Sequence, residues 1–204
     1  MGFYVERILP RIADKALSAP EFSRLRARAA RGLGGEVLEI GFGSGRNLDH
    51  YAPAVRRVLA VEPASGAREL AAGRIAAAPM PVEFVGLEGE ALPLEDESVD
   101  NALSTWTLCT ISDVGRALDE VRRVLRPGGA LHFVEHGRAP DAKVVRWQDR
   151  LTPLQRRAFG GCHLNRPIDE LIAGAGLAVE RLETFYVTGP KAFCFTFEGV
   201  AVKS

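Results

Sequence analysis

Apolar residues recur along the chain with two different periods. Short apolar runs with the length of strands occur at residues 36–40, 55–61, 82–85, 99–105 and 130–134. Between them, residues 65–77 are helix-like and alanine-rich, and residues 114–125 carry apolar side chains at helical spacing, ending at the sequence RPGG (126–129). Strands that alternate with helices predict an α/β fold, a doubly wound and mostly parallel sheet of the Rossmann-like kind.

The C-terminal part of the chain departs from this alternation. Residues 179–187 and 193–202 have the apolar character of two further strands. They flank the sequence TGPK at 188–191, which is typical of a hairpin turn. We therefore expect an antiparallel C-terminal hairpin to close the parallel sheet.

The first 34 residues show helical periodicity instead. One helical face carries Val5, Ile8, Leu9, Ile12 and Ala16. Pro20 is placed to open a second helix, with Phe22, Leu25 and Ala29 directed inward. Four arginines make this helix basic, and we interpret Arg24, Arg26, Arg28 and Arg31 as a solvated face, with a surface for lipid or anions as the alternative. We expect residues 1–34 to form a helical lid on a main domain of residues 35–204.

Composition excludes several classes of protein. The 204 residues include 26 Lys and Arg and 26 Asp and Glu, so nothing in the net charge favours a nucleic-acid partner. No apolar run reaches the ~18 residues of a transmembrane helix. Cys109, Cys162 and Cys194 are scattered and odd in number, which argues against a disulfide framework and favours a reducing, cytoplasmic setting.

A glycine-rich turn follows the first predicted strand. The sequence EIGFGSG spans residues 39–45, and we expect a helix to begin at Arg46. Glycines let the backbone approach a ligand closely, and the helix N-terminus adds positive potential. The dinucleotide fingerprint G-x-G-x-x-G would need its third glycine at Arg46. With Glu39 beside the loop, the pattern favours a ligand that carries an ammonium and a sulfonium group over a pyrophosphate.

Two more acidic residues follow the next two predicted strands. Glu62 ends the second strand, where a carboxylate can accept both hydroxyls of a ribose. Glu88 follows the third strand and is placed to accept from an adenine amino group, while the Gly89 N–H meets a ring nitrogen. The three acids together match the ammonium, ribose and adenine groups of S-adenosylmethionine (SAM).

In their order, these segments resemble the landmarks of class I SAM-dependent methyltransferases. The resemblance rests on LEIGFGSG (38–45), Glu62, EGEALPLEDESVD (88–100) and RVLRPGG (123–129), and it covers roughly residues 36–135. It implies SAM as the cofactor, bound by Glu39, Gly41, Gly43, Glu62, Glu88 and Gly89. We also expect contacts from Gly45 and Thr105. Small-molecule methyltransferases commonly have Asp at the position of Glu88, whose longer arm should still reach.

The most unusual stretches lie outside these landmarks, on the acceptor side. They are STWTLCTI (104–111), FVEHG (133–137) and GGCHLNR (160–166). Together with Trp147-Gln148 and GVAVK (199–203), they resemble the methyltransferase-like thiol S-methyltransferases, which methylate small thiols and sulfide. This resemblance covers most of residues 36–203. Quinone and phospholipid methyltransferases share much of the same pattern.

Methyl transfer from a sulfonium is an in-line displacement, so the protein mainly aligns the reacting atoms. A thiol acceptor must also react as its thiolate. His136 is the first candidate to promote thiolate formation, and His163 is the second. The expected acceptor pocket comprises Trp106, Cys109, Trp147, Cys162 and Arg166, with core packing as the alternative for its tryptophans and cysteines.

We expect no metal site. His132 and His136 would lie roughly 13 Å apart on a strand, too far to share one ion. Cys162 and His163 are adjacent and chelate poorly, and no C-x-x-C motif exists.

Three functions fit the sequence. The first is methylation of a small thiol or sulfide with SAM. The second is methylation of a quinone or phospholipid headgroup, with peripheral membrane contact through the basic N-terminal helices. The third is a non-catalytic SAM-binding module. The pattern indicates a small-molecule partner and leaves the oligomeric state open.

Overall fold

The protein is built on one seven-stranded sheet, seen in a computed structural model that describes residues 2–86 and 89–204. The strand order is β3-β2-β1-β4-β5-β7-β6, and only β7 runs antiparallel to its two neighbours. The strands are β1 (Gly35–Ile40), β2 (Val55–Val61), β3 (Val82–Gly86), β4 (Val99–Thr105), β5 (Leu125–His136), β6 (Leu177–Tyr186) and β7 (Phe195–Lys203). This confirms the mostly parallel sheet with an antiparallel C-terminal hairpin.

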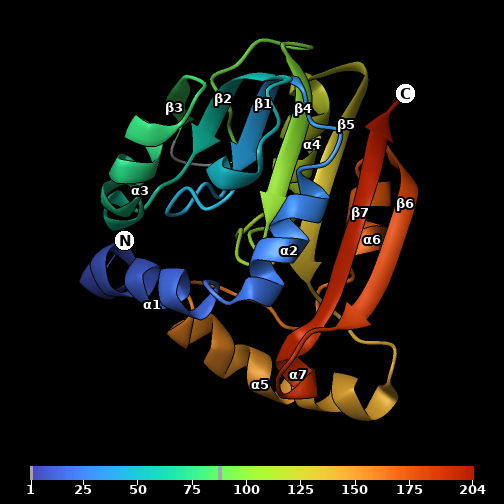
Figure 1. Ribbon diagram of the computed structural model, residues 1–204. Helices are drawn as coiled ribbons and strands as arrows, with labels where there is room; N and C mark the ends of the chain where they lie inside the picture. The colour runs from blue at the N-terminus through green and yellow to red at the C-terminus, as the bar shows by residue number, and fades with distance from the viewer. Residues whose placement is uncertain (1, 87–88) are drawn as a thin grey trace.

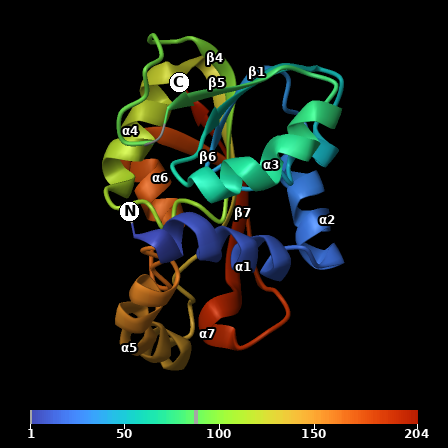
Figure 2. The same cartoon turned by 90° about the vertical axis from the view of Figure 1, so that its left-hand side faces the viewer.

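Helices cover both faces of the sheet, and further helices lie beyond the carboxyl ends of its parallel strands (Figures 1 and 2). They are α1 (Leu9–Ala16), α2 (Pro20–Ala29), α3 (Ser65–Ala77), α4 (Val114–Val124), α5 (Ala142–Ala158), α6 (Ile168–Gly174) and α7 (Lys191–Cys194), with a π-helical turn at Tyr4–Ile8 and a 3-10 turn at Leu48–His50. One apolar core packs α4 and α6 against the sheet, through residues such as Leu118 and Ile172. The opposite core packs α2 and α3, through Leu25, Ala29 and Ala71.

The loop after β1 differs from the sequence expectation. We expected a helix from Arg46, but the chain forms only the short turn at Leu48–His50 before β2 begins. Asn47 and Tyr51, on either side of this turn, both direct their side chains to the buried Glu39. These two contacts hold residues 47–51 against the base of the glycine loop. A longer helix would have directed this segment away from Glu39.

The N-terminal segment divides into two parts with different roles. Pro20 opens α2 as predicted, and this helix is part of the core through Leu25 and Ala29. By contrast, the turn at Tyr4–Ile8 and α1 contain no buried residue. Figures 1 and 2 show α1 crossing the end of the sheet at the carboxyl end of β4, between α3 and α5. Only residues 2–17, before α2, therefore lie across this end of the sheet; we propose that they act as a lid and call them the lid below.

Two details of the helical prediction were wrong. Val5 and Leu9 do face inward, but Ile8, Ile12 and Ala16 are exposed, because the π-helical turn shifts the inward face of the following helix. Arg26 is buried rather than solvated, since α2 rests on the sheet. Among the described residues, no helix combines the length and the apolar character needed to cross a membrane.

Candidate active site

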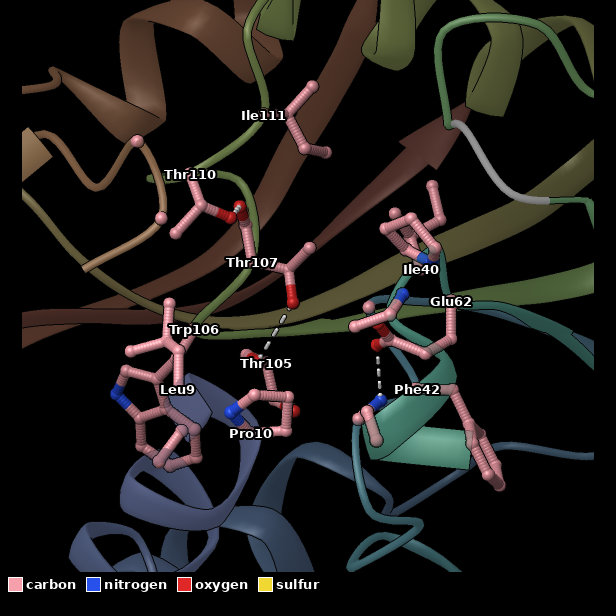
Figure 3. Close-up of a pocket in the computed structure, with 18 of the residues that line it drawn as sticks. Leu9, Pro10, Ile40, Phe42, Glu62, Thr105, Trp106, Thr107, Thr110 and Ile111 are labelled. Atoms are coloured by element: carbon pink, nitrogen blue, oxygen red, sulfur yellow. Dashed lines mark hydrogen bonds between the residues drawn. The ribbon is translucent and has the colours of Figure 1, made fainter. Parts of the chain in front are cut away.

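A cavity of about 620 Å³ opens at the edge of the sheet where the parallel strands end. This volume lies within the range of small-molecule sites. Its walls come from the glycine loop after β1, from the ends of β2 and β4, from the lid, and from the loop after α5. Figure 3 shows the cavity between Glu62 and Phe42 on one side and Leu9, Pro10 and Trp106 on the other.

The glycine loop approaches the end of β4 so closely that a side chain would not fit. A Cβ at Gly41 would overlap the side chain of Thr107, and the backbone of Gly41 has a φ of 71°. Gly41 and Gly43 both line the cavity. Gly45 does not line it, and its φ of 76° serves the turn instead. The loop therefore presents backbone rather than side chains to a ligand.

Glu62 ties the glycine loop to the end of β2. Its Oε2 accepts from Gly43 N at 2.8 Å and its Oε1 accepts from Ala64 N at 2.9 Å. A carboxylate offers about four lone-pair sites, so about two remain for a ligand. Glu62 lines the cavity, and burial raises the pKa of its carboxyl group. The position therefore suits the acceptance of two hydroxyl groups from a bound molecule.

Glu39 takes a different place from the one expected. Its carboxylate is fully buried and absent from the cavity wall; Oε1 accepts from Asn47 Nδ2 at 2.7 Å and Oε2 accepts from the hydroxyl of Tyr51. Asn47 lines the cavity, and its Oδ1 is buried without a partner. A buried acceptor of this kind requires a donor. Asn47, which the sequence analysis missed, therefore offers an unpaired acceptor at the cavity wall, and Glu39 accepts from its side-chain amide behind that wall.

The buried Glu39 predicts a pH-dependent stability. Burial raises the pKa of its carboxyl group from 4.5 to about 7. The folded state therefore holds this proton more tightly than the unfolded state, and its contribution to stability is lost as the pH rises from about 4.5 through about 7. Relative to Glu39→Gln, the wild-type protein should lose up to ~3 kcal/mol of unfolding free energy over that window. Urea unfolding between pH 5 and 8 measures it, with the exposed Glu69→Gln as control; parallel curves for wild type and Glu39→Gln would refute the assignment.

Arg26 is the buried cation of the cavity wall. Its guanidinium lies over the ring of Trp106, 4.6 Å from the centroid, and one terminal nitrogen donates to Leu17 O at 3.1 Å. Burial and, next, the nearby Arg46 lower its pKa to about 10. The Nε atom is buried without a partner. The cavity wall thus holds an unpartnered donor on Arg26 and an unpartnered acceptor on Asn47, which suit the carboxylate and the ammonium of an amino-acid group.

Polar contacts hold the lid over the cavity. Asp14 accepts from both Ser44 and Arg46 of the glycine loop, at 2.5 and 2.7 Å. Arg7 pairs with Glu69 of α3 at 2.6 Å. The lid also meets the C-terminal end of α5, because the hydroxyl of Tyr4 donates to Ala158 O. The lid therefore contacts the glycine loop and α3 on one side of the cavity and α5 on the other.

The acceptor end of the cavity is formed by the segment after β4. Thr105, Trp106, Thr107, Thr110 and Ile111 line it, together with the loop after α5 at 159–161. Trp106 has a φ of 53°, a strained value for a bulky residue. The fully buried Glu135 of β5 fixes this turn, since its Oε1 accepts from Thr107 N at 2.9 Å and from Ser104 Oγ at 2.8 Å. Glu135 was not among the predicted site residues.

Behind this wall, three soft ligands converge from three separate segments. Cys109 follows β4, His136 ends β5, and Cys162 follows α5; their Sγ, nitrogen and Sγ atoms all lie within 4.8 Å of one another. Cys162 Sγ is 3.1 Å from His136 Nε2. The pKa of the Cys162 thiol falls to about 4, because the Cys109 thiol and then His136 stabilise the thiolate more than burial opposes it. Burial raises the pKa of Cys109.

Several predicted acceptor residues do not reach the cavity. His136 and His163, the proposed catalytic residues, are absent from its wall, as are Cys109, Cys162 and Arg166. Arg166 instead donates to the carbonyls of Leu108 and Ile111 and braces the wall from behind. Trp147 requires a correction: it was expected in the pocket but is 57% exposed, because α5 turns that face outward.

On the cofactor side, Thr105 and Gly89 line the cavity as expected. Glu88, the expected partner of an adenine amino group, lies outside the residues that the structure describes. The expectation of no metal site rested on residues that lie near one another in sequence. Tertiary packing brings together Cys109, His136 and Cys162, which are far apart in sequence.

Known proteins are similar to this chain in sequence and in fold. A family model described as a methyltransferase domain matches residues 38–133. Thiol S-methyltransferase TMT1B of Rattus norvegicus is 33% identical over 159 residues, which are 75% of this chain and 65% of that protein. Demethylmenaquinone methyltransferase of Roseiflexus castenholzii is 32% identical over 171 residues, covering 77% of this chain and 72% of that protein.

The fold agrees with solved methyltransferase structures. Geranyl diphosphate methyltransferase in complex with SAM superposes with a TM-score of 0.70 at 14% identity, over 95% of this chain and 88% of that one. The 32% identity to the demethylmenaquinone methyltransferase, over 77% of this chain and 72% of that protein, shows that the chain belongs to the class I SAM-dependent methyltransferases, whose cofactor is SAM. The chain spans 65% of the length of the thiol S-methyltransferase from rat.

Proposed function

We propose that the enzyme transfers the methyl group of SAM to the sulfur of a small thiol. The observation that carries this proposal is the similarity to thiol S-methyltransferase TMT1B, which covers 75% of this chain. The chain spans 65% of that relative's length. The acceptor of the relative is here proposed for this protein. The largely apolar acceptor end, at Leu9, Trp106 and Ile111, suits a small and weakly polar molecule.

Each end of SAM has a matching group on the cavity wall. Glu62 would accept the ribose hydroxyls, Asn47 Oδ1 the ammonium, and Arg26 would bind the carboxylate. The backbone of Gly41 and Gly43 allows the close approach. When bound, SAM supplies an activated methyl group on a sulfonium. The protein's part is to orient the acceptor at Thr107 and Thr110 and to exclude water with the lid.

No imidazole of the described residues lines the cavity, so the proposed mechanism uses no side-chain general base. The donor is already activated, and a thiol in solution is partly ionised near neutral pH. Alignment alone can supply the larger part of the rate enhancement. Transfer should therefore follow the thiolate fraction of the acceptor.

A panel of acceptors tests the proposal. With labelled SAM, small aliphatic thiols and sulfide should be methylated, and the rate at subsaturating thiol should rise about tenfold per pH unit below the pKa of the thiol. A thiol of lower pKa should reach its plateau at a lower pH. An alcohol of matched shape is the control and should give no product. Failure to methylate any thiol at any pH would exclude a thiol acceptor.

A quinol is the second candidate, favoured by the 32% identity to a demethylmenaquinone methyltransferase. The lid also exposes Phe3, Ile8 and Ile12, which could rest on a membrane that carries such an acceptor. The same panel, extended with a quinol and with phospholipid vesicles, separates the candidates. Transfer to the quinol in place of any thiol would move the assignment to this second class.

A further inference from the structure

We propose that Cys109, His136 and Cys162 bind a thiophilic divalent cation, which we infer to be Zn²⁺, behind the acceptor end of the cavity. Two thiolates and one imidazole form a donor set that Zn²⁺ prefers. Three protein ligands also resemble zinc sites that keep a fourth position for water or another small ligand.

The spacing of the three ligand atoms suits one ion. Zn–S bonds of about 2.3 Å and Zn–N bonds of about 2.0–2.1 Å, arranged as a tetrahedron, place ligand atoms about 3.5–3.8 Å apart. The three atoms already lie within 4.8 Å of one another. The 3.1 Å between Cys162 Sγ and His136 Nε2 would widen by only about 0.5 Å to admit the ion.

The backbone holds the three ligands together without help from a metal. His163 N donates to Cys109 O at 2.8 Å, which joins the two loops that carry the cysteines. Arg138 N donates to Arg166 O at 2.8 Å, which joins the end of β5 to the loop after Cys162. A preformed set of ligands lowers the ordering cost of binding the ion.

The charge and the surrounding groups also fit. Zn²⁺ with two thiolates is neutral, so the complex suits a site in which Cys109 and Cys162 are almost fully buried. Binding would release the remaining thiol protons to solvent. Gln155 Nε2 lies 3.6 Å from Cys162 Sγ and would support the coordinated sulfur as a second layer of contacts.

The test uses the full chain, freed of metal with a chelator and kept reduced with a phosphine. Wild-type protein should bind one Zn²⁺ per chain with a Kd of ~1 µM or tighter. Co²⁺ in its place should give the near-ultraviolet charge-transfer absorption of thiolate ligands. The double variant Cys109→Ser/Cys162→Ser and the single variant His136→Asn should each weaken Zn²⁺ binding on the order of 10²-fold or more. Cys194→Ser, which changes the third buried cysteine, is the matched control and should bind as wild type does.

SAM binding is measured in every variant, so that loss of the fold is not mistaken for loss of a ligand. Two results would overturn the proposal. One is a reduced wild-type protein that takes up no stoichiometric Zn²⁺ and shows no charge-transfer band with Co²⁺, a measurement that needs no variant. The other is a double variant that still binds both SAM and Zn²⁺ with wild-type affinity.

Discussion

Deleting residues 1–17 should lower the rate of methyl transfer on the order of 10²-fold, while SAM binding weakens by roughly tenfold or less. Residues 2–17, the part of the deleted segment that the structure describes, contain no buried residue, so the core should survive their loss. Val5, Leu9 and Leu17 line the cavity, and without them water reaches the reacting groups and the acceptor loses one of its walls. SAM keeps its contacts with the glycine loop and Glu62, although Asp14 no longer braces that loop.

Single-turnover kinetics and calorimetry on the truncated chain separate the two effects. Lys15→Ala in the full chain, on the exposed side of α1, is the control and should change neither quantity. Cutting further, through α2, is no test of a lid, because Leu25 and Ala29 belong to the core. Equal losses of turnover and of SAM affinity would mean that the first 17 residues serve the cofactor site rather than the acceptor.

Glu62→Ala should weaken SAM binding tenfold or more. The carboxylate would lose two hydrogen bonds to ribose hydroxyls, and each charge-assisted bond is worth about 1.5–3 kcal/mol. The substitution also removes the acceptor of Gly43 N and Ala64 N, so the glycine loop loses part of its support. Both effects act in the same direction, and calorimetry with SAM measures their sum.

A cycle with a cofactor analogue isolates the ribose contact. S-adenosylhomocysteine and its form without ribose hydroxyls are titrated into wild type and Glu62→Ala. If Glu62 binds the hydroxyls, their removal should cost much less affinity in the variant than in wild type. Independent, additive losses would show that Glu62 acts only on the loop. Glu180→Ala, at an exposed position of β6, controls for the loss of one negative charge.

Local patterns carried most of the fold. The strands at 55–61 and 99–105 and the helix at 65–77 have the predicted bounds, because apolar runs and helical spacing are properties of short segments. The C-terminal hairpin followed from the turn at 188–191 in the same way. The glycine loop and Glu62 were also found from sequence. The loop directly follows β1 and Glu62 directly follows β2, so both lie at the carboxyl ends of the parallel strands, where the cavity opens.

Packing between distant segments decided the rest. Whether Arg26 is buried depends on how α2 rests on the sheet, and whether Trp147 is exposed depends on the rotation of α5. Glu39 is fully buried and does not line the cavity, because Asn47 and Tyr51 cover its carboxylate.

The sequence by itself determined the methyltransferase fold and the places of the glycine loop and Glu62, because these follow from contiguous motifs at strand ends. Only the tertiary structure decided the acceptor side. Cys109, His136 and Cys162 are separated by 27 and 26 positions in sequence and meet only because β4, β5 and the loop after α5 end at the same place. The local pattern of apolar and polar residues does not indicate such a contact, because each segment would have the same pattern wherever the other two segments lay.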